Sequence, residues 1–241
     1  MKISIVVPAF NEEKLLAASL AQIKSAATAF TQINWETELI VCDNNSTDRT
    51  AEIARAAGAT VVFEPVNQIA RARNCGAAAA TGDWLIFVDA DSRPGVELFA
   101  DVAEQIKSGR YLAGGVTIRL DEHFFVAGLI TRFWNFLSRS RRLLAGSFIF
   151  CETTAFRKIN GFSHELFVTE ELELSQRLKQ LARATGKKII VLNRHPLVTS
   201  ARKMKLYSGR EYLRFFARFI FQRRQALTSR DAAHLWYDGR R

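Results

Sequence analysis

Two aspartates, Asp89 and Asp91, flank a single alanine directly after the apolar run Trp84–Val88. Paired carboxylates at the end of a buried strand suit a hard divalent cation that bridges diphosphate oxygens. We therefore expect Asp89 and Asp91 to bind Mn²⁺ or Mg²⁺ beside a departing nucleoside diphosphate. The alternative is a solvent-exposed turn whose two acids cap a helix that begins near Pro94.

The elements that position these acids alternate short β-branched runs with amphipathic helices, which is the pattern of an α/β fold with a parallel sheet. Ligands of such sheets bind at the carboxyl ends of the strands. Three expected strand ends deliver polar groups to that edge, at 8–12, 43–44 and 89–91. Strands are predicted at Ile3–Pro8, Glu38–Cys42, Thr60–Phe63 and Trp84–Val88, and helices at Glu12–Phe30, Thr50–Ala57 and Ile69–Ala80.

The pattern is looser after Gly109. Strands are expected there at Tyr111–Arg119 and Lys188–Leu192, and helices at Phe124–Leu137, Thr169–Ala184 and Gly209–Arg224.

The composition is that of a globular protein with one sizeable core. The 241 residues include three scattered cysteines without metal-ligand spacing, which favours reduced thiols and a cytoplasmic protein. No run approaches the roughly 20 apolar residues of a membrane-spanning helix. We therefore expect a cytoplasmic location, with the inner face of the membrane as the alternative.

The net charge of +10 is concentrated in the last 41 residues. Residues 201–241 contain 11 Lys and Arg against 3 Asp and Glu, which gives +8, whereas residues 1–200 contain 23 against 21, which gives +2. A basic segment on a near-neutral body indicates a contact surface for nucleic acid, an anionic membrane or a phosphorylated substrate. No finger or RNP-like motif is present, so we expect no specific nucleic-acid partner.

The predicted helix Gly209–Arg224 places aromatic residues opposite arginines, as a membrane-surface anchor does. The segment 124–144 repeats this arrangement. The alternative for both is a helix that packs on the domain and keeps one solvated face.

Four segments, in order and in spacing, resemble the family 2 glycosyltransferases. They are 5–13 (IVVPAFNEE), 43–50 (DNNSTDRT), 72–76 (ARNCG) and 82–91 (GDWLIFVDAD). The resemblance covers about residues 1–200 and implies the GT-A fold, a Rossmann-like, mainly parallel sheet flanked by helices. It implies transfer of a sugar from a nucleotide sugar, with a UDP-sugar favoured, to a glycan or lipid-linked acceptor of the cell envelope. We divide the chain into a donor-binding half (1–110), a looser acceptor half (111–200) and the basic amphipathic tail (201–241).

The resemblance also implies roles by position in the donor half. Asn44 stands where many relatives carry a second aspartate, which leaves the base of the nucleotide open. The alternatives are that Asp43 and Ser46 only cap a helix and that Arg73 lies at the surface. The implied roles are a nucleoside pocket of Pro8, Phe10 and Glu12, a hydrogen bond from the base to Asp43, diphosphate or ribose contact by Arg73, a donor contact by Ala90, a position near the ribose and metal for Asp89, and direct metal ligation by Asp91.

Glu170 and Glu171 resemble the acidic pair of the family, which is usually Glu-Asp and precedes a helix. The second acid of that pair is the general base, so Glu171 would deprotonate the acceptor hydroxyl for a single displacement with inversion. Glu171 is one methylene longer than the usual residue. The alternatives are that Glu170 is the base, or that both acids only stabilise a helix that Thr169 caps.

Three basic residues are further candidates. His195 follows an expected strand and would complete the metal shell, as a histidine does in some GT-A enzymes, unless it is structural. Arg202 and Lys203 resemble a segment that approaches the diphosphate in some small members, with a basic linker as the alternative.

Other functions fit the residues less well. A sugar-phosphate nucleotidyltransferase needs a glycine-rich, basic loop after the first strand, and a dinucleotide oxidoreductase needs GxGxxG there, whereas residues 8–13 contain neither glycine nor a basic residue. A polyanion-binding protein or a non-catalytic sugar-binding relative is the remaining alternative, against which the intact acids Asp89, Asp91 and Glu171 argue.

Overall fold

The computed structural model describes residues 1–122, 125–144 and 146–200. The basic tail, with the predicted helix Gly209–Arg224 and the candidates Arg202 and Lys203, lies outside the described residues, as does Phe124. None of the helices that the structure describes is long and apolar enough to cross a bilayer.

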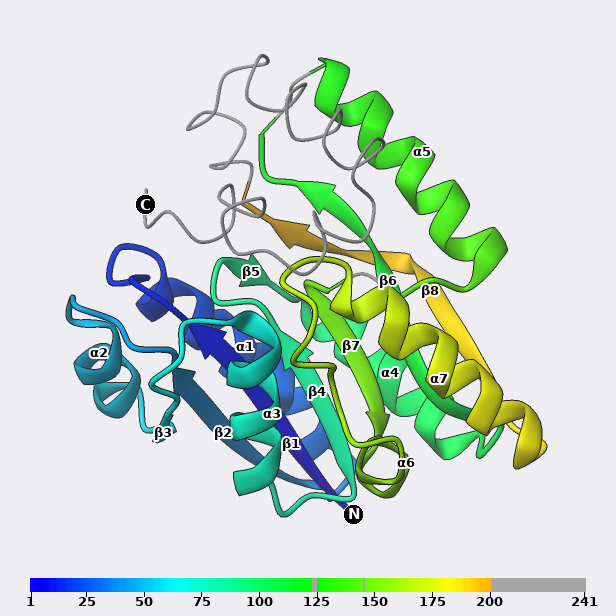
Figure 1. Cartoon of the computed structure of the whole chain (residues 1–241), viewed down its shortest axis with the longest axis horizontal. Coiled ribbons are helices and arrows are strands. Elements are labelled where there is room, and N and C mark those ends of the chain that lie inside the picture. Colours follow the sequence, from blue (N-terminus) through cyan, green and yellow to red (C-terminus); the bar gives the residue numbers. More distant parts are fainter. Residues whose placement is uncertain (123–124, 145, 201–241) are drawn as a thin grey trace.

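The described residues form one eight-stranded sheet with helices on both faces (Figure 1). The strand order is β3-β2-β1-β4-β7-β6-β8-β5. The strands are β1 (Lys2–Ala9), β2 (Glu36–Asp43), β3 (Thr60–Phe63), β4 (Trp84–Val88), β5 (Ser92–Arg93), β6 (Tyr111–Leu120), β7 (Phe148–Glu152) and β8 (Lys188–Thr199). The helices are α1 (Leu16–Thr31), α2 (Thr50–Ala56), α3 (Ile69–Ala79), α4 (Val96–Lys107), α5 (Phe125–Arg141), α6 (Thr153–Lys158) and α7 (Glu170–Ala184).

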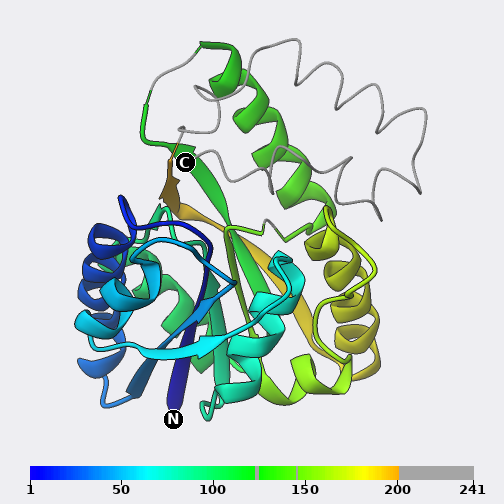
Figure 2. The same cartoon turned by 60° about the vertical axis from the view of Figure 1, so that its left-hand side comes forward.

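The first four strands are parallel, as the sequence predicts, and their carboxyl ends meet at one edge. The register of β1 and β2 sets Pro8 beside Cys42 and Ala9 beside Asp43. β1 is apolar on both faces because helices cover both. Ile3, Ile5 and Val7 belong to the core cluster that includes α1 and α4, whereas Val6 belongs to the cluster under α3, α6 and α7 (Figure 2).

Helix α3 packs unusually close to β1. A Cβ on Gly76 would lie 2.4 Å from Val6 Cγ1, so only glycine allows this approach. Gly76 follows Arg73 by three residues, so this close packing holds the part of α3 that carries Arg73 against the sheet.

The second half mixes strand directions. β7 is antiparallel to β4 and β6, β6 and β8 are parallel with two register shifts, and β5 is antiparallel to β8. The prediction of a mainly parallel sheet is confirmed, but β5, β7 and α6 were not predicted, and β8 continues to Thr199 rather than ending at Leu192. β7 is a short run that is apolar up to its last residue, Glu152, and such a run has no periodicity that separates strand from buried helix.

Candidate active site

Two loops at the carboxyl edge are joined by hydrogen bonds. Asn11, which has a left-handed φ of 52°, receives a bond at Oδ1 from Thr47 N (2.8 Å), and its own N–H donates to Ser46 Oγ (3.0 Å). Glu12 N donates to Thr50 Oγ1 at 2.8 Å. The loops after β1 and β2 therefore form one unit.

This unit holds the residues that were predicted to contact the nucleoside. Pro8, Glu12 and Asp43 are buried and Phe10 is half-buried. Ser46 N donates to Asp43 Oδ1 at 3.0 Å, so Asp43 braces the turn after β2 and not a helix end, since the N-cap of α2 is Arg49. That bond uses one of the two carboxylate oxygens and is compatible with a ligand at the other.

The hydrogen bonds of Asn44 account for an asparagine where many relatives carry a second aspartate. Its Nδ2 donates to Glu64 O (3.2 Å) and Val66 O (2.7 Å), and its Oδ1 accepts from Gln68 N (2.9 Å). An aspartate would set a negative oxygen against two carbonyl oxygens. The amide at this position therefore anchors the β3–α3 connection.

Arg73 is the centre of the site. The side chain is only 2% exposed, so the surface alternative is wrong. Nη1 donates to Glu170 Oε1 at 2.7 Å, and Nη2 donates to Asp89 Oδ1 at 3.0 Å and to Gly146 O at 2.9 Å. The guanidinium lies 5.2 Å from the ring centroid of Phe162. Arg73 thus joins the acid after β4 to the acid at the start of α7.

Gly146 completes the contact around Arg73. A Cβ there would lie 3.1 Å from Arg73 Nη2 and 3.5 Å from Glu171 Cδ, so a side chain would press on both groups. Sequence reasoning missed Gly146, because a single glycine between two apolar segments carries no signal of its partners.

Glu170 and Glu171 are buried neighbouring carboxyl groups whose titrations affect each other. Burial, and next the charge of Glu171, raises the pKa of Glu170 to about 8, although Arg73 acts in the opposite direction. Burial also raises the pKa of Glu171, against the effect of Arg73. A pair in which both pKa values are raised retains a proton close to neutral pH, as acid–base catalysis requires.

The turn before this pair is strained. Thr169 has a φ of 64°, which is rare for a β-branched residue. Its side chain makes no cap hydrogen bond, so the predicted side-chain cap is wrong. The acids in the first turn of α7 nevertheless favour the positive end of the helix dipole. Strain of this kind costs about 1–3 kcal/mol and gathers at functional sites.

Two amides of α3 fix the segment that leads to this turn. Gln68 Nε2 donates to His164 O (2.8 Å) and Leu166 O (3.0 Å). Asn74 donates to Phe162 O (2.8 Å) and accepts from Phe162 N (2.9 Å). These residues were not predicted; their only signal is two amides, one just before α3 and one in its middle, in a helix rich in alanine.

The predicted metal ligands are only partly assembled. Asp89 is 29% exposed and shares one oxygen with Arg73, and Asp91 lies two residues on. His195 Nδ1 instead lies 2.9 Å from Asp101 Oδ2 of α4. Among the described residues no three His, Cys, Asp or Glu side chains converge, so His195 does not join the two aspartates there. Two carboxylates still fit Mg²⁺ or Mn²⁺, which commonly takes its other ligands from phosphate and water.

Residues 4–161 match the family model for glycosyl transferase family 2. The chain belongs to this family. Its relatives include an uncharacterised glycosyltransferase of Mycobacterium tuberculosis, which is 39% identical over 89 residues (37% of this chain, 36% of that protein). A dolichol-phosphate mannosyltransferase of Pyrococcus furiosus is 30% identical over 130 residues (48% and 35%). The matches thus span about a third of the length of these two relatives.

Solved structures of glycosyltransferases share the fold. S. aureus TarS 1–349 in complex with UDP-GlcNAc superposes with a TM-score of 0.64 at 19% identity, over 98% of this chain and 69% of that one. The mannosyltransferase PcManGT of Pyrobaculum calidifontis, in complex with GDP-Man and Mn²⁺, gives 0.68 at 20% identity, over 88% and 59%. The GT-A fold expected for this family 2 member is confirmed.

Proposed function

We propose that this glycosyltransferase moves a sugar from a nucleotide sugar to a hydroxyl group of a glycan or lipid-linked acceptor, and we favour a UDP-sugar as the donor. The observation that carries the proposal is the buried Arg73, which bonds both Asp89 and Glu170. A single guanidinium thereby links the acid expected beside the donor to the acid pair expected beside the acceptor. The named ligands of TarS and PcManGT, UDP-GlcNAc and GDP-Man, support a nucleotide-sugar donor.

In this proposal the unit formed by the β1 and β2 loops receives the nucleoside. Pro8, Phe10 and Glu12 line the pocket, and the carboxylate of Asp43 accepts a hydrogen bond from an imide N–H of the base. Arg202 and Lys203, beyond the described residues, would approach the diphosphate.

Glu171 acts as the general base. The acceptor hydroxyl gives its proton to the Glu171 carboxylate while its oxygen forms a bond to the anomeric carbon. The bond from that carbon to the diphosphate oxygen breaks on the opposite side, so the configuration inverts. Glu170, buried and bonded to Arg73, is a positioning residue that holds its neighbour in place. Burial raises the pKa of Glu171 and thereby its proton affinity.

Asp91 and Asp89 would hold Mn²⁺ or Mg²⁺, and PcManGT, which was solved with Mn²⁺, supports a metal of this kind. The bound ion would neutralise charge on the departing nucleoside diphosphate. Arg73 orients Asp89 through a charge-assisted bond.

We infer a role in the synthesis of cell-envelope glycan or glycolipid, on the cytoplasmic side of an anionic membrane. The charge of +8 after residue 200 supports this location, because a basic segment is attracted to anionic lipid.

A donor screen tests the proposal. Nucleotide sugars are incubated with the protein, with and without Mn²⁺, and release of nucleoside diphosphate is measured. We expect release from one class of donor, dependent on the metal and abolished in Asp91→Asn. Calorimetry of the same variant is the control: undiminished Mn²⁺-dependent nucleotide binding would rule out Asp91 as a ligand. Release from no donor, with or without acceptor mixtures, would contradict the proposed activity.

A further inference from the structure

Helix α5 exposes an apolar stripe. Leu129 and Ile130 are 52% and 54% exposed, and Phe133 and Phe136 are 67% and 70% exposed. These four are the majority of the seven large apolar residues that are most exposed in the described part of the chain. Their spacing puts all four within one arc of the helix surface. An apolar arc of this size on one helix indicates a contact with another phase or molecule.

Arginines border the stripe. Arg132 and Arg139 are exposed along one edge, and Arg141 and Arg142 are exposed at the end of the helix. The sequence from 125 to 142 contains these four arginines and no acid. A basic border around an apolar stripe is the pattern of a helix that lies in a membrane interface.

The opposite side of α5 is fixed to the domain, so the stripe cannot turn inward. Asn135 accepts a bond from Ile118 N (3.0 Å) and donates to Ile118 O (2.8 Å), which fastens the helix to β6. Lys179 of α7 donates to the carbonyl of Arg141 at 2.6 Å. Figures 1 and 2 show α5 beside the outer ends of β6 and β8, with its last turn next to α7.

A groove beneath α5 continues the positive surface. It has a volume of about 870 Å³, and Leu129 and Phe136 of the stripe also line it. Its other described lining residues include three arginines and one acid, namely Arg119, Arg132, Arg139 and Glu122. Guanidinium groups bind phosphate through paired N–H donors. The groove therefore suits the phosphate of a lipid headgroup.

The charge decides between the molecules that could cover the stripe. A second copy of the chain would bring the same four arginines against these four. Residues 201–241 carry +8 and would be repelled as well. An anionic bilayer offers both an apolar depth and the opposite charge.

We propose that the outer face of α5 lies on an anionic membrane, with Leu129, Ile130, Phe133 and Phe136 at the boundary between headgroups and acyl chains. The arginines at its border contact lipid phosphates. This assigns the contact to α5, which is hydrogen-bonded to β6 and α7. The contact does not depend on sugar transfer.

Co-sedimentation with vesicles tests the stripe. The full-length protein is mixed with phosphatidylcholine vesicles, with or without phosphatidylglycerol. We expect binding only to the anionic vesicles, and at least a tenfold weaker partition for Phe133→Ser with Phe136→Ser. Phe63→Ser is the matched control, since Phe63 is 58% exposed on β3, and it should bind normally. Phe133→Leu with Phe136→Leu keeps the stripe apolar and should also bind, which separates lost contact from a damaged fold.

A second pair of variants tests the border. Arg132→Gln with Arg139→Gln should weaken binding about 25-fold at low salt, since each arginine near an anionic leaflet contributes about fivefold. Arg55→Gln with Arg110→Gln removes the same charge from exposed sites elsewhere and should change binding far less. Equal losses in the two pairs would overturn the proposal in favour of general charge attraction.

Two other results would overturn it. Normal vesicle binding of the Phe133/Phe136 serine variant, with loss of binding in Phe216→Ser with Phe219→Ser, would assign the contact to the tail. A concentration-dependent dimer that the Phe133/Phe136 change abolishes, without vesicle binding, would assign the stripe to a second copy. Donor hydrolysis is measured in parallel: its absence with vesicle binding intact would contradict the proposed function and leave the α5 contact standing.

Discussion

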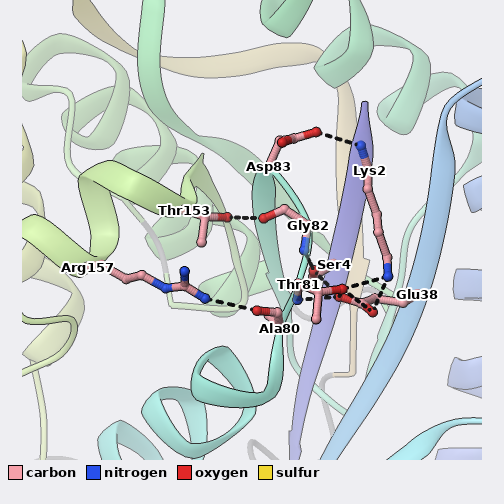
Figure 3. Close-up of polar contacts among 9 residues, drawn as sticks. All are labelled: Lys2, Ser4, Glu38, Ala80, Thr81, Gly82, Asp83, Thr153 and Arg157. Carbon is pink, nitrogen blue, oxygen red and sulfur yellow. Dashed lines mark hydrogen bonds and ion pairs between the residues drawn. The ribbon is translucent and has the colours of Figure 1, made fainter.

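Two acids lie in hydrogen-bonded clusters at opposite edges of the sheet, and their surroundings differ. At the amino edge, Glu38 receives bonds from Ser4 Oγ (2.5 Å) and Thr81 N (2.7 Å) and pairs with Lys2 Nζ at 2.8 Å (Figure 3). Burial raises the pKa of Glu38, but these bonds outweigh it and hold the pKa at about 2. At the carboxyl edge, Glu170 meets one arginine and a second carboxyl group, and its pKa rises to about 8.

The cluster at the amino edge also joins neighbouring strands through Gly82. Ser4 Oγ also accepts from Gly82 N at 2.8 Å, and Thr153 Oγ1 donates to Gly82 O at 2.6 Å (Figure 3). A Cβ on Gly82 would lie 2.6 Å from Ser4 Oγ, so the close approach requires glycine. An acid whose oxygens are satisfied fixes strands together. An acid pair that lacks enough donors holds a proton that it can exchange.

The sharpest way to test this difference is to make the same change at both edges. Glu171→Gln keeps the size of the side chain and removes the proton acceptor, so transfer should fall by about 10²–10⁴ with little change in donor affinity. Glu38→Gln is the matched control and should leave turnover near normal. Steady-state rates with titrated donor distinguish the two. Full activity in Glu171→Gln would move the base to Glu170 or to another group.

Replacing Arg73, whose guanidinium lies between Asp89 and Glu170, should lower the stability of the fold and not only the rate of transfer. Arg73→Gln leaves Glu170 buried without its partner, and such losses cost about 3–5 kcal/mol in the free energy of unfolding. Urea unfolding measures this. Arg73→Lys keeps the charge but has fewer hydrogen-bond donors, so its unfolding midpoint should lie between those of the unchanged protein and Arg73→Gln. An unchanged midpoint in Arg73→Gln would show that the buried contacts carry no stability.

The pH dependence of stability should have opposite signs at the two acids. Relative to the ordinary pKa of 4.5, the lowered pKa of Glu38 gives stability above pH 4.5 that is lost as pH falls toward about 2. The raised pKa of Glu170 gives stability below pH 4.5 that is lost as pH rises through about 8. Each contributes a slope of at most about 1.4 kcal/mol per pH unit.

Urea unfolding across pH therefore separates them. Glu38→Gln should flatten the acid limb and Glu170→Gln the limb between pH 4.5 and about 8. A change of the same limb in both variants would mean that the two acids share one environment.

The parallel half of the fold follows from the sequence because each strand and helix carries its own period. Thr60–Phe63 and Trp84–Val88 are strands with the predicted bounds. Strand direction is a property of pairs, so nothing in Phe148–Glu152 alone tells that β7 runs against β4.

The site was predictable where a motif names a residue and not where tertiary contact defines its role. Asp89, Glu170 and Arg73 were selected by resemblance, but the bonds that unite them join residues 16 and 97 positions apart. The resemblance implied that Arg73 contacts the diphosphate or ribose, but it gave no sign that the side chain is buried. Charged residues are seldom buried, and the acids from two other elements are what make this burial tolerable.

The grip of α3 on residues 162–166 limits how this enzyme can be recombined with its relatives. Gln68 and Asn74 belong to the first half of the chain, yet they hold main-chain groups of the second. A chimera joined near residue 110 would pair an α3 from one parent with a 162–166 segment from another. A chimera that preserves these hydrogen bonds must take α3 and residues 162–166 from the same parent. The outward face of α5 can be exchanged independently.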